Sequence, residues 1–146
     1  MKIRLMTPFD YEQAYVLWLS CAGMGLNDID DSQAGIHRFL DRNPETWFVA
    51  EENGVVVGAI LAGNDGRRGY IYHTAVSPAF RKQGIGRQLV ESVMNAFDQI
   101  GVTKTALVVF SKNGGGNAFW EKLGFTQRED LIYRNKAITE MNRIDT

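Results

Sequence analysis

The chain reads AVSPAFRKQGIGR over residues 75–87, where an apolar, aromatic segment gives way to a segment of helical periodicity. Residues 69–76 are rich in aromatic and β-branched side chains, which is typical of a strand. After the quoted stretch, apolar residues recur at three- and four-residue spacing as far as Ile100, and Gly101 ends the pattern. The stretch is therefore predicted to be a loop that leads from a strand into a long helix.

This loop has the composition of a site for phosphate groups. The first N–H groups of a helix lack partners within the helix and carry partial positive charge, and Gly84 and Gly86 allow a diphosphate to approach the backbone. The dinucleotide fingerprint is excluded, because Leu89 stands at its third glycine and Ala106 where its acidic residue belongs. No G-x-x-x-x-G-K-[ST] sequence is present either. A helix start with glycines and no ligand is the alternative interpretation at this point.

The rest of the chain predicts a mixed α+β sheet. Further strands are expected over residues 2–6, 46–51, 55–62, 103–110 and 125–133. Further helices are expected over residues 7–22, after the cap Ser32 as far as Asn43, and over residues 117–123 with a late, mobile start caused by Gly114, Gly115 and Gly116. The Asn53-Gly54 turn predicts an antiparallel hairpin, and strand–helix–strand order near the end predicts at least one parallel pair. Residues from about Thr139 are expected to form a frayed polar tail.

Composition limits the function classes. The 146 residues are 45% hydrophobic and 23% charged, which predicts one globular domain over residues 1–146. The net charge of −1 gives no bulk positive field for nucleic acid or an anionic membrane. A single cysteine, Cys21, the lack of a signal peptide and the short apolar run at 55–62 predict a cytoplasmic protein that does not span a membrane. One cysteine and two distant histidines predict no metal site.

Two stretches together resemble a known family. The sequence R-K-Q-G-I-G at residues 81–86, after A-V-S-P, resembles the R/Q-x-x-G-x-G/A signature of the GNAT (Gcn5-related) N-acetyltransferases. The sequence N-G-G-G-N-A-F-W-E-K-L-G-F at residues 113–125 resembles the second signature of that family, N-x-x-A-x-x-L-Y-E-K-L-G-F. Two ordered motifs at family spacing are more specific than either alone. The resemblance implies the GNAT fold, a central mixed sheet of six to seven strands flanked by about four helices.

The resemblance also implies a function and its cosubstrate. It implies an N-acetyltransferase that moves the acetyl group of acetyl-coenzyme A (acetyl-CoA) to a primary amine by direct attack in a ternary complex. The acceptor is a small amine, a protein N-terminus or a lysine side chain. The residues implied to hold acetyl-CoA are Thr74, Ala75, Val76, Arg81, Lys82, Gln83, Gly84, Ile85, Gly86, Arg87 and Asn113. Arg67 and Arg68 are further candidates for the outer phosphates, and the Val76 N–H is implied to polarise the thioester carbonyl.

The chain departs from the family at the positions of the acid and the base. Trp120 replaces the tyrosine that commonly serves as general acid, and an indole N–H does not protonate a thiolate. Val108 stands where related ribosomal-protein alanine acetyltransferases place a glutamate base. Tyr133 is the candidate acid and His73 the candidate base, with packing in the sheet as the alternative for each. A catalytically reduced acyl-CoA-binding sensor or regulatory module is the alternative function.

The acceptor side is expected in the first two helices and the loop between them. The carboxylates of Asp28, Asp30 and Asp31 are candidates for recognising a cationic acceptor, or they belong to a solvated loop. Trp18 and Trp47 line the same pocket or pack in the core. Family members often pair, so a homodimer is allowed, and nothing in the sequence indicates a nucleic-acid partner.

Overall fold

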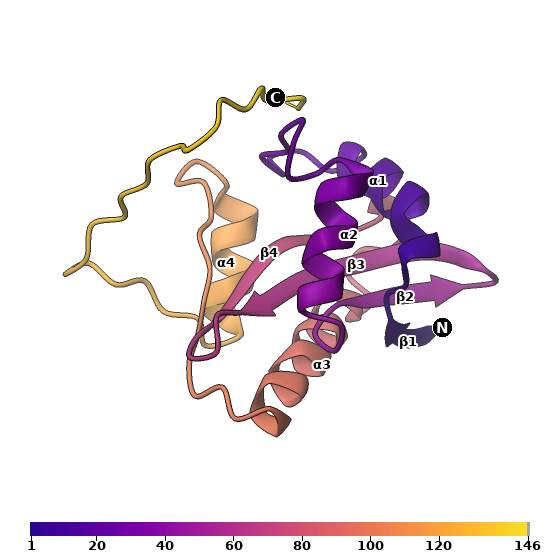
Figure 1. The fold of residues 1–146 in the computed structure, drawn as a ribbon. Coiled ribbons are helices and arrows are strands. Elements are labelled where there is room, and N and C mark those ends of the chain that lie inside the picture. The colour runs from indigo at the N-terminus through magenta and orange to yellow at the C-terminus, as the bar shows by residue number, and fades with distance from the viewer. Residues whose placement is uncertain (146) are drawn as a thin grey trace.

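The computed structural model describes residues 1–145 and contains a five-stranded sheet in the order β1-β2-β3-β4-β5 (Figure 1). The strands are β1 (Lys2–Leu5), β2 (Phe48–Glu52), β3 (Val55–Asn64), β4 (Gly69–Val76) and β5 (Thr105–Ala106). Neighbours from β1 to β4 run antiparallel, and β5 runs parallel to β4. The Asn53-Gly54 turn between β2 and β3 has φ angles of 50° and 80°, which confirms the predicted hairpin.

Four α-helices accompany the sheet: α1 (Tyr11–Leu19), α2 (Gln33–Arg42), α3 (Ile85–Gln99) and α4 (Gly114–Lys122). Single 3₁₀ turns at Pro8–Asp10 and Pro78–Phe80 precede α1 and the loop before α3. The predicted cap of α2 is confirmed, because the Ser32 hydroxyl oxygen accepts a hydrogen bond from the Gly35 N–H at 3.1 Å. Among residues 1–145, no helix is long and apolar enough to cross a membrane.

The core has two parts, one on each face of the sheet. Trp18 of α1 and Trp47 are completely buried in the part that α1 and α2 cover, so both tryptophans are core residues. Leu89 and Phe97 of α3 are buried in the other part. Helix α3 lies so close to the sheet that a Cβ at Gly69 would come within 2.7 Å of the Phe97 ring. The sheet is thus fixed from both faces near β3 and β4.

A β-bulge interrupts the pairing of β3 with β4. The register moves from Ile60 opposite Thr74 to Ala62 opposite Ile71, so two residues of β4, at positions 72 and 73, share one position of β3. A bulge bends its strand, and β4 has β5 as a partner only before the bulge, at positions 69 and 70. The rest of β4 has an unpaired edge on the side of β5.

The bulge explains why the predicted sheet is too large. A strand is predicted over residues 103–110, but only Thr105–Ala106 pairs with β4. Exposed and half-buried side chains still alternate as far as Phe110, so the backbone is extended but lies beside no strand. The strand predicted over residues 125–133 is also absent from the described residues, and Leu131 and Tyr133 are at least 60% exposed. The expectation of six to seven strands is therefore wrong.

Three smaller expectations also need correction. Helix α1 ends at Leu19, three residues before the predicted end at residue 22. Helix α4 begins at Gly114 rather than at Asn117, because the Asn113 side chain caps it. The frayed tail is wrong too, because the Asp145 carboxylate accepts hydrogen bonds from the Gly25 and Leu26 N–H groups at 3.0 and 2.7 Å. Figure 1 shows the yellow end of the chain leaving α4 in a wide arc and returning to this loop.

Candidate active site

The unpaired edge of β4 presents backbone groups to the space beside it. The Ser77 N–H donates to the Val57 carbonyl across the sheet at 2.8 Å. Because bonded and non-bonded positions alternate along an antiparallel pair, the N–H and C=O groups of Val76 and Thr74 must point away from β3. They point toward the side of β5, where β4 has lost its partner. We call residues 72–76 the β4 edge.

The β4 edge contains an unsatisfied polar atom. The hydroxyl oxygen of Thr74 is buried and makes no hydrogen bond within residues 1–145. Buried hydroxyl groups normally have a partner, and those without one are often completed by a ligand or water. Together with the unpaired backbone groups, this hydroxyl gives the edge capacity to bind a molecule that carries amide groups.

The loop after the β4 edge has the free N–H groups predicted for a phosphate site. Within residues 1–145, none of the six backbone N–H groups from Lys82 to Arg87 donates to a protein acceptor. Lys82 and Gly84 have φ angles of 63° and 79°, which turn successive N–H groups toward one side of the loop. The 15-residue helix α3 starts directly afterwards, so its positive end faces the same space. We call residues 81–87 the phosphate loop.

The two glycines of this loop have different roles. Gly84 supplies the left-handed backbone conformation at the N-cap of α3, and a Cβ there would touch nothing. Gly86 has no positive φ, but a Cβ there would come within 3.1 Å of the Phe119 ring of α4. Gly86 therefore brings the two signature motifs into contact.

Arg81 turns back onto the β4 edge instead of pointing outward. Its Nε donates to the Val76 carbonyl at 3.2 Å, and its Nη2 lies 3.5 Å from the Cys21 sulfur. The Cys21 thiol in turn donates to the same carbonyl at 3.6 Å. The sequence did not predict Cys21 at the site, because the apolar spacing of α1 does not show which end of a strand the helix covers.

His73 forms a buried pair with the loop before α2. Its Nε2 lies 2.6 Å from Oδ1 of Asp31, and the two side chains are only 12% and 5% exposed. The Trp18 ring packs edge-on against the imidazole with centroids 5.0 Å apart. The bulge sets this direction, since it displaces His73 from strict alternation along β4. His73 therefore projects to the face of the sheet that α1 and α2 cover.

The acidic loop is mostly engaged within the protein. Asp31 is bonded to His73, and the Asp28 carboxylate accepts from the backbone and side-chain amides of Asn142 at 2.7 and 3.1 Å. Asp30 accepts only from the Asn27 side chain and is exposed. Of the three predicted recognition carboxylates, Asp30 is the one that stays open to an acceptor.

Three tyrosines lie near the same face. The pKa of Tyr70 is raised to about 12, mainly by burial and to a smaller extent by the nearby phenols of Tyr133 and Tyr72. Burial also raises the pKa of Tyr72, with smaller contributions from Tyr133 and Asp30. The candidate acid Tyr133 is thus close to β4 although it is 66% exposed. Tyr70 and Tyr72 remain protonated at neutral pH.

The second signature motif is placed mainly by packing. Oδ1 of the Asn113 side chain accepts from the Gly116 N–H at 2.9 Å and caps α4, so Nδ2 of the same side chain is the atom left for a ligand. Trp120 is buried between Phe119 and Phe125. Trp120 is therefore a packing residue, and its indole N–H does not act as a general acid.

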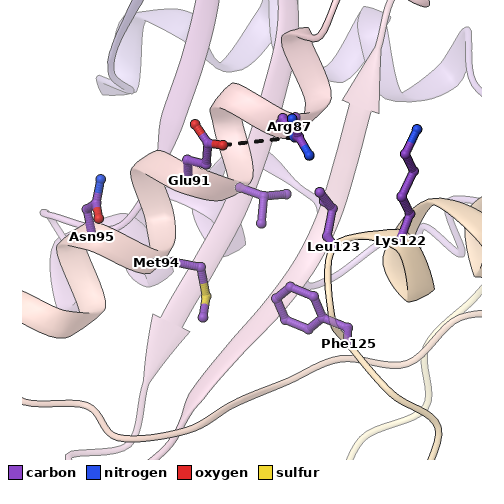
Figure 2. Close-up of a pocket in the computed structure, with 8 residues that line it drawn as sticks. Arg87, Glu91, Met94, Asn95, Lys122, Leu123 and Phe125 are labelled. Atoms are coloured by element: carbon purple, nitrogen blue, oxygen red, sulfur yellow. Dashed lines mark ion pairs between the residues drawn. The ribbon is translucent and has the colours of Figure 1, made fainter.

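Of the arginines predicted to contact phosphate groups, Arg87 is part of the phosphate loop, whereas Arg67 and Arg68 lie elsewhere. Figure 2 shows Arg87 and Lys122 at one end of a cavity of about 470 Å³ between α3 and α4, with Met94 and Phe125 along it. Arg87 also pairs with Glu91 at 4.0 Å. The prediction for Arg67 and Arg68 is wrong, because they precede β4 and lie at the end of that strand opposite the phosphate loop.

Comparison with known proteins agrees with this geometry. Residues 11–125 match the family model described as Acetyltransferase (GNAT) family. An acetyltransferase of Pectobacterium atrosepticum is 33% identical over 140 residues, which cover 96% of this chain and 97% of that protein. Ard1 from Thermoplasma volcanium superposes with a TM-score of 0.77 at 25% identity, covering 86% of this chain and 82% of that one. The aminoglycoside N-acetyltransferase AAC(6')-Iy, solved with CoA, superposes with a TM-score of 0.72 at 21% identity, covering 93% and 99%. The chain therefore belongs to the GNAT acetyltransferase family and is an acyltransferase that uses acetyl-CoA.

Proposed function

We propose that this enzyme transfers the acetyl group of acetyl-CoA to the nitrogen of a primary amine. The observation that carries the proposal is the continuity of the β4 edge with the phosphate loop. The outward-pointing N–H groups of Thr74 and Val76 lead directly to the free N–H groups of residues 82–87. This arrangement suits a molecule with an amide-bearing arm and a diphosphate, which are the two recognisable parts of coenzyme A.

Each part of the site then has a role in binding. Backbone groups of Thr74 and Val76 hold the arm, whereas the N–H and C=O of the predicted contact Ala75 point to β3; the phosphate-loop amides, Arg81 to Gly86, hold the diphosphate. Lys82 and Arg87 neutralise the outer phosphates as flexible surface cations. Nδ2 of Asn113 is free to donate to the arm near the thioester.

The proposed catalytic roles use groups on or near the β4 edge. Bound acetyl-CoA supplies an acetyl group activated as a thioester. The Val76 N–H donates a hydrogen bond to the carbonyl oxygen as negative charge develops there. His73 takes the proton that the amine nitrogen loses, and Tyr133 provides a proton for the leaving sulfur. Both assignments are supported by position, because His73 is part of β4 and the Tyr133 phenol is close enough to influence Tyr70 and Tyr72.

The acceptor is a small amine, a protein N-terminus or a lysine side chain. AAC(6')-Iy acts on aminoglycosides, which are small-molecule amines, and this supports an amine acceptor here. The exposed Asp30 carboxylate beside Tyr72 supports an acceptor that carries positive charge. Two of the three acidic residues are already bonded, so recognition by charge is local rather than extended.

The test combines cofactor binding with turnover. Wild-type protein is titrated with acetyl-CoA by calorimetry beside a variant with Arg81→Ala, Gly84→Ala and Gly86→Ala, and Gly115→Ala serves as control because its Cβ would touch nothing. We expect saturable binding by the wild type and the control, and binding at least tenfold weaker in the triple variant. Thiol release is then followed with spermidine, a peptide with a free N-terminus and an N-terminally blocked lysine peptide.

Each outcome has a distinct meaning. Acceptor-dependent thiol release together with acetylated amine in the mass spectrum supports the proposal. Binding of acetyl-CoA without acceptor-dependent release from any amine contradicts it. Equal binding by the wild type and the triple variant contradicts the role of the phosphate loop.

A further inference from the structure

Asp31 is a buried carboxylate with two hydrogen-bond donors, one on each oxygen. The Asn27 N–H donates to Oδ2 at 2.8 Å, and Nε2 of His73 lies 2.6 Å from Oδ1. An ionised carboxylate only accepts hydrogen bonds, so Nε2 must carry the hydrogen in this pair. The neutral imidazole then has its lone pair on Nδ1.

The lone pair of Nδ1 is unused by the protein. Within residues 1–145, no donor or acceptor is bonded to Nδ1 of His73. The ring is held in place by Trp18, and the main chain of Asp31 is held by the Tyr11 hydroxyl, which donates to the Asp31 carbonyl at 2.7 Å. The imidazole is therefore fixed at its Nε2 side and open at its Nδ1 side.

We propose that Asp31 is a positioning residue, which holds His73 as the Nε2–H tautomer so that Nδ1 receives the proton of the acceptor amine. This inference rests on the proposed function. As the amine nitrogen bonds to the acetyl carbon and the carbon–sulfur bond breaks, the amine proton passes to Nδ1. The leaving sulfur gains one proton, so the products balance as acetylated amine and free thiol. The imidazolium that forms is paired with the buried Asp31 carboxylate, which offsets the cost of a buried charge.

The geometry makes a sharp prediction for Asp31→Asn. An amide has one accepting and one donating end, while its two neighbours here require an acceptor on both sides. If the oxygen stays with the Asn27 N–H, the amide NH₂ faces Nε2 of His73 and makes that nitrogen an acceptor. The hydrogen then moves to Nδ1, and the lone pair needed for proton transfer is lost. The opposite orientation leaves two donors facing each other at Asn27.

The tautomer is read directly from the nitrogen chemical shifts of the imidazole rings. The chain has two histidines, and His37→Gln assigns the second one. In the wild type we expect His73 with Nε2 protonated and Nδ1 unprotonated, and in Asp31→Asn the reverse. His37 contacts the Pro8 carbonyl instead of a carboxylate, so its shifts should not change. A wild-type His73 with Nδ1 protonated would overturn the proposal without any variant.

Kinetics test whether this placement matters for the reaction. Using the best acceptor of the amine panel, we expect Asp31→Asn to lower kcat about a hundredfold or more, with KM for acetyl-CoA unchanged. Asp41→Asn is the control, because it removes one exposed carboxylate from α2 without touching His73, and its kcat should stay near that of the wild type. In a His73→Ala background, Asp31→Asn should cause no further loss of kcat.

The outcomes separate this role from the proposed function. Absence of turnover by the wild type would contradict the proposed function and with it the role of Asp31. Turnover by the wild type with an equal kcat in Asp31→Asn would overturn the role alone. A loss of kcat in Asp31→Asn that persists fully in the His73→Ala background would also overturn it, because Asp31 would then act independently of His73.

Discussion

The gap proposed for acetyl-CoA lies between the β4 edge and residues 105–110, and these two sides are built differently. The β4 edge is paired with β3 on one side and covered by Trp18 of α1 and by Cys21, which follows that helix. The facing side, residues 105–110, has two paired residues, and Val108 is 58% exposed. The groups assigned to catalysis gather on the fixed side: the Val76 amide, His73 and its partner Asp31. We infer that the proposed carbonyl polarisation and proton transfer depend on the well-packed strand β4, whereas residues 105–110 mainly limit the shape of the gap.

The largest expected effect comes from removing a core side chain beside the β4 edge. Trp18→Ala should lower the free energy of unfolding by about 3–5 kcal/mol, because it opens a cavity in the core and removes the ring that holds His73. Val108→Ala on the facing side should change it by less than about 0.5 kcal/mol. Urea unfolding of both variants measures this. A loss for Val108→Ala as large as that for Trp18→Ala would show that the facing side is packed as well.

An intermediate effect comes from two aspartate–arginine pairs elsewhere in the molecule, one largely buried beside β1 and one exposed after α4. Asp10 is buried and accepts two hydrogen bonds of 2.8 Å from Arg4, which hold the pKa of Asp10 below its usual value of about 4. A lowered pKa in the folded state gives stability that is complete above about pH 4 and lost as the pH falls further. Asp10→Asn should therefore cost about 1.5–3 kcal/mol at pH 7 and flatten the acid side of the stability profile.

The matched pair, Arg128 and Asp130, is fully exposed in the segment after α4. Solvent screens such a pair, so Asp130→Asn should leave the unfolding midpoint unchanged at every pH. Thermal unfolding from pH 3 to pH 8 compares the two variants. Equal acid sensitivity of both would contradict the contrast between the buried and exposed regions.

The smallest expected effect concerns Tyr133 on the exposed side. Tyr133→Phe removes the candidate acid, but water reaches this position, so we expect kcat to fall only about tenfold and KM for acetyl-CoA to stay the same. Steady-state thiol release measures it, with Tyr15→Phe as control for loss of a phenol elsewhere. An unchanged kcat would remove Tyr133 from the mechanism and leave protonation of the sulfur to water.

Local patterns predicted the regular elements well. The bounds of β4, the Ser32 cap and the end of α3 shortly before Gly101 follow from residues that are neighbours in sequence. The apolar run also predicted a strand over residues 103–110, but its pairing depends on where β4 bends, and the bulge at residues 72–73 leaves no local signal. The predicted strand count was too high for this reason and because residues 125–133 form no strand.

The site was predictable where it is made of backbone and less so where it is made of side chains. The phosphate loop follows from Gly84 and the helix start. The bond between Asp31 and His73 joins residues 42 positions apart, so no spacing rule reveals it. The single domain over residues 1–146, the cytoplasmic location and the homodimer remain predictions.

The bonds between the loop at Gly25 and the C-terminal residues also have a consequence for synthesis. Asp28 and Asn142 are 114 positions apart, and the ribosome adds about 5–20 residues per second. The loop that leads to Asp31 therefore waits roughly 6–23 seconds for the residues that hold it. During translation this loop therefore lacks its bonds to Asn142 and Asp145 until β4, the phosphate loop and α4 have already emerged.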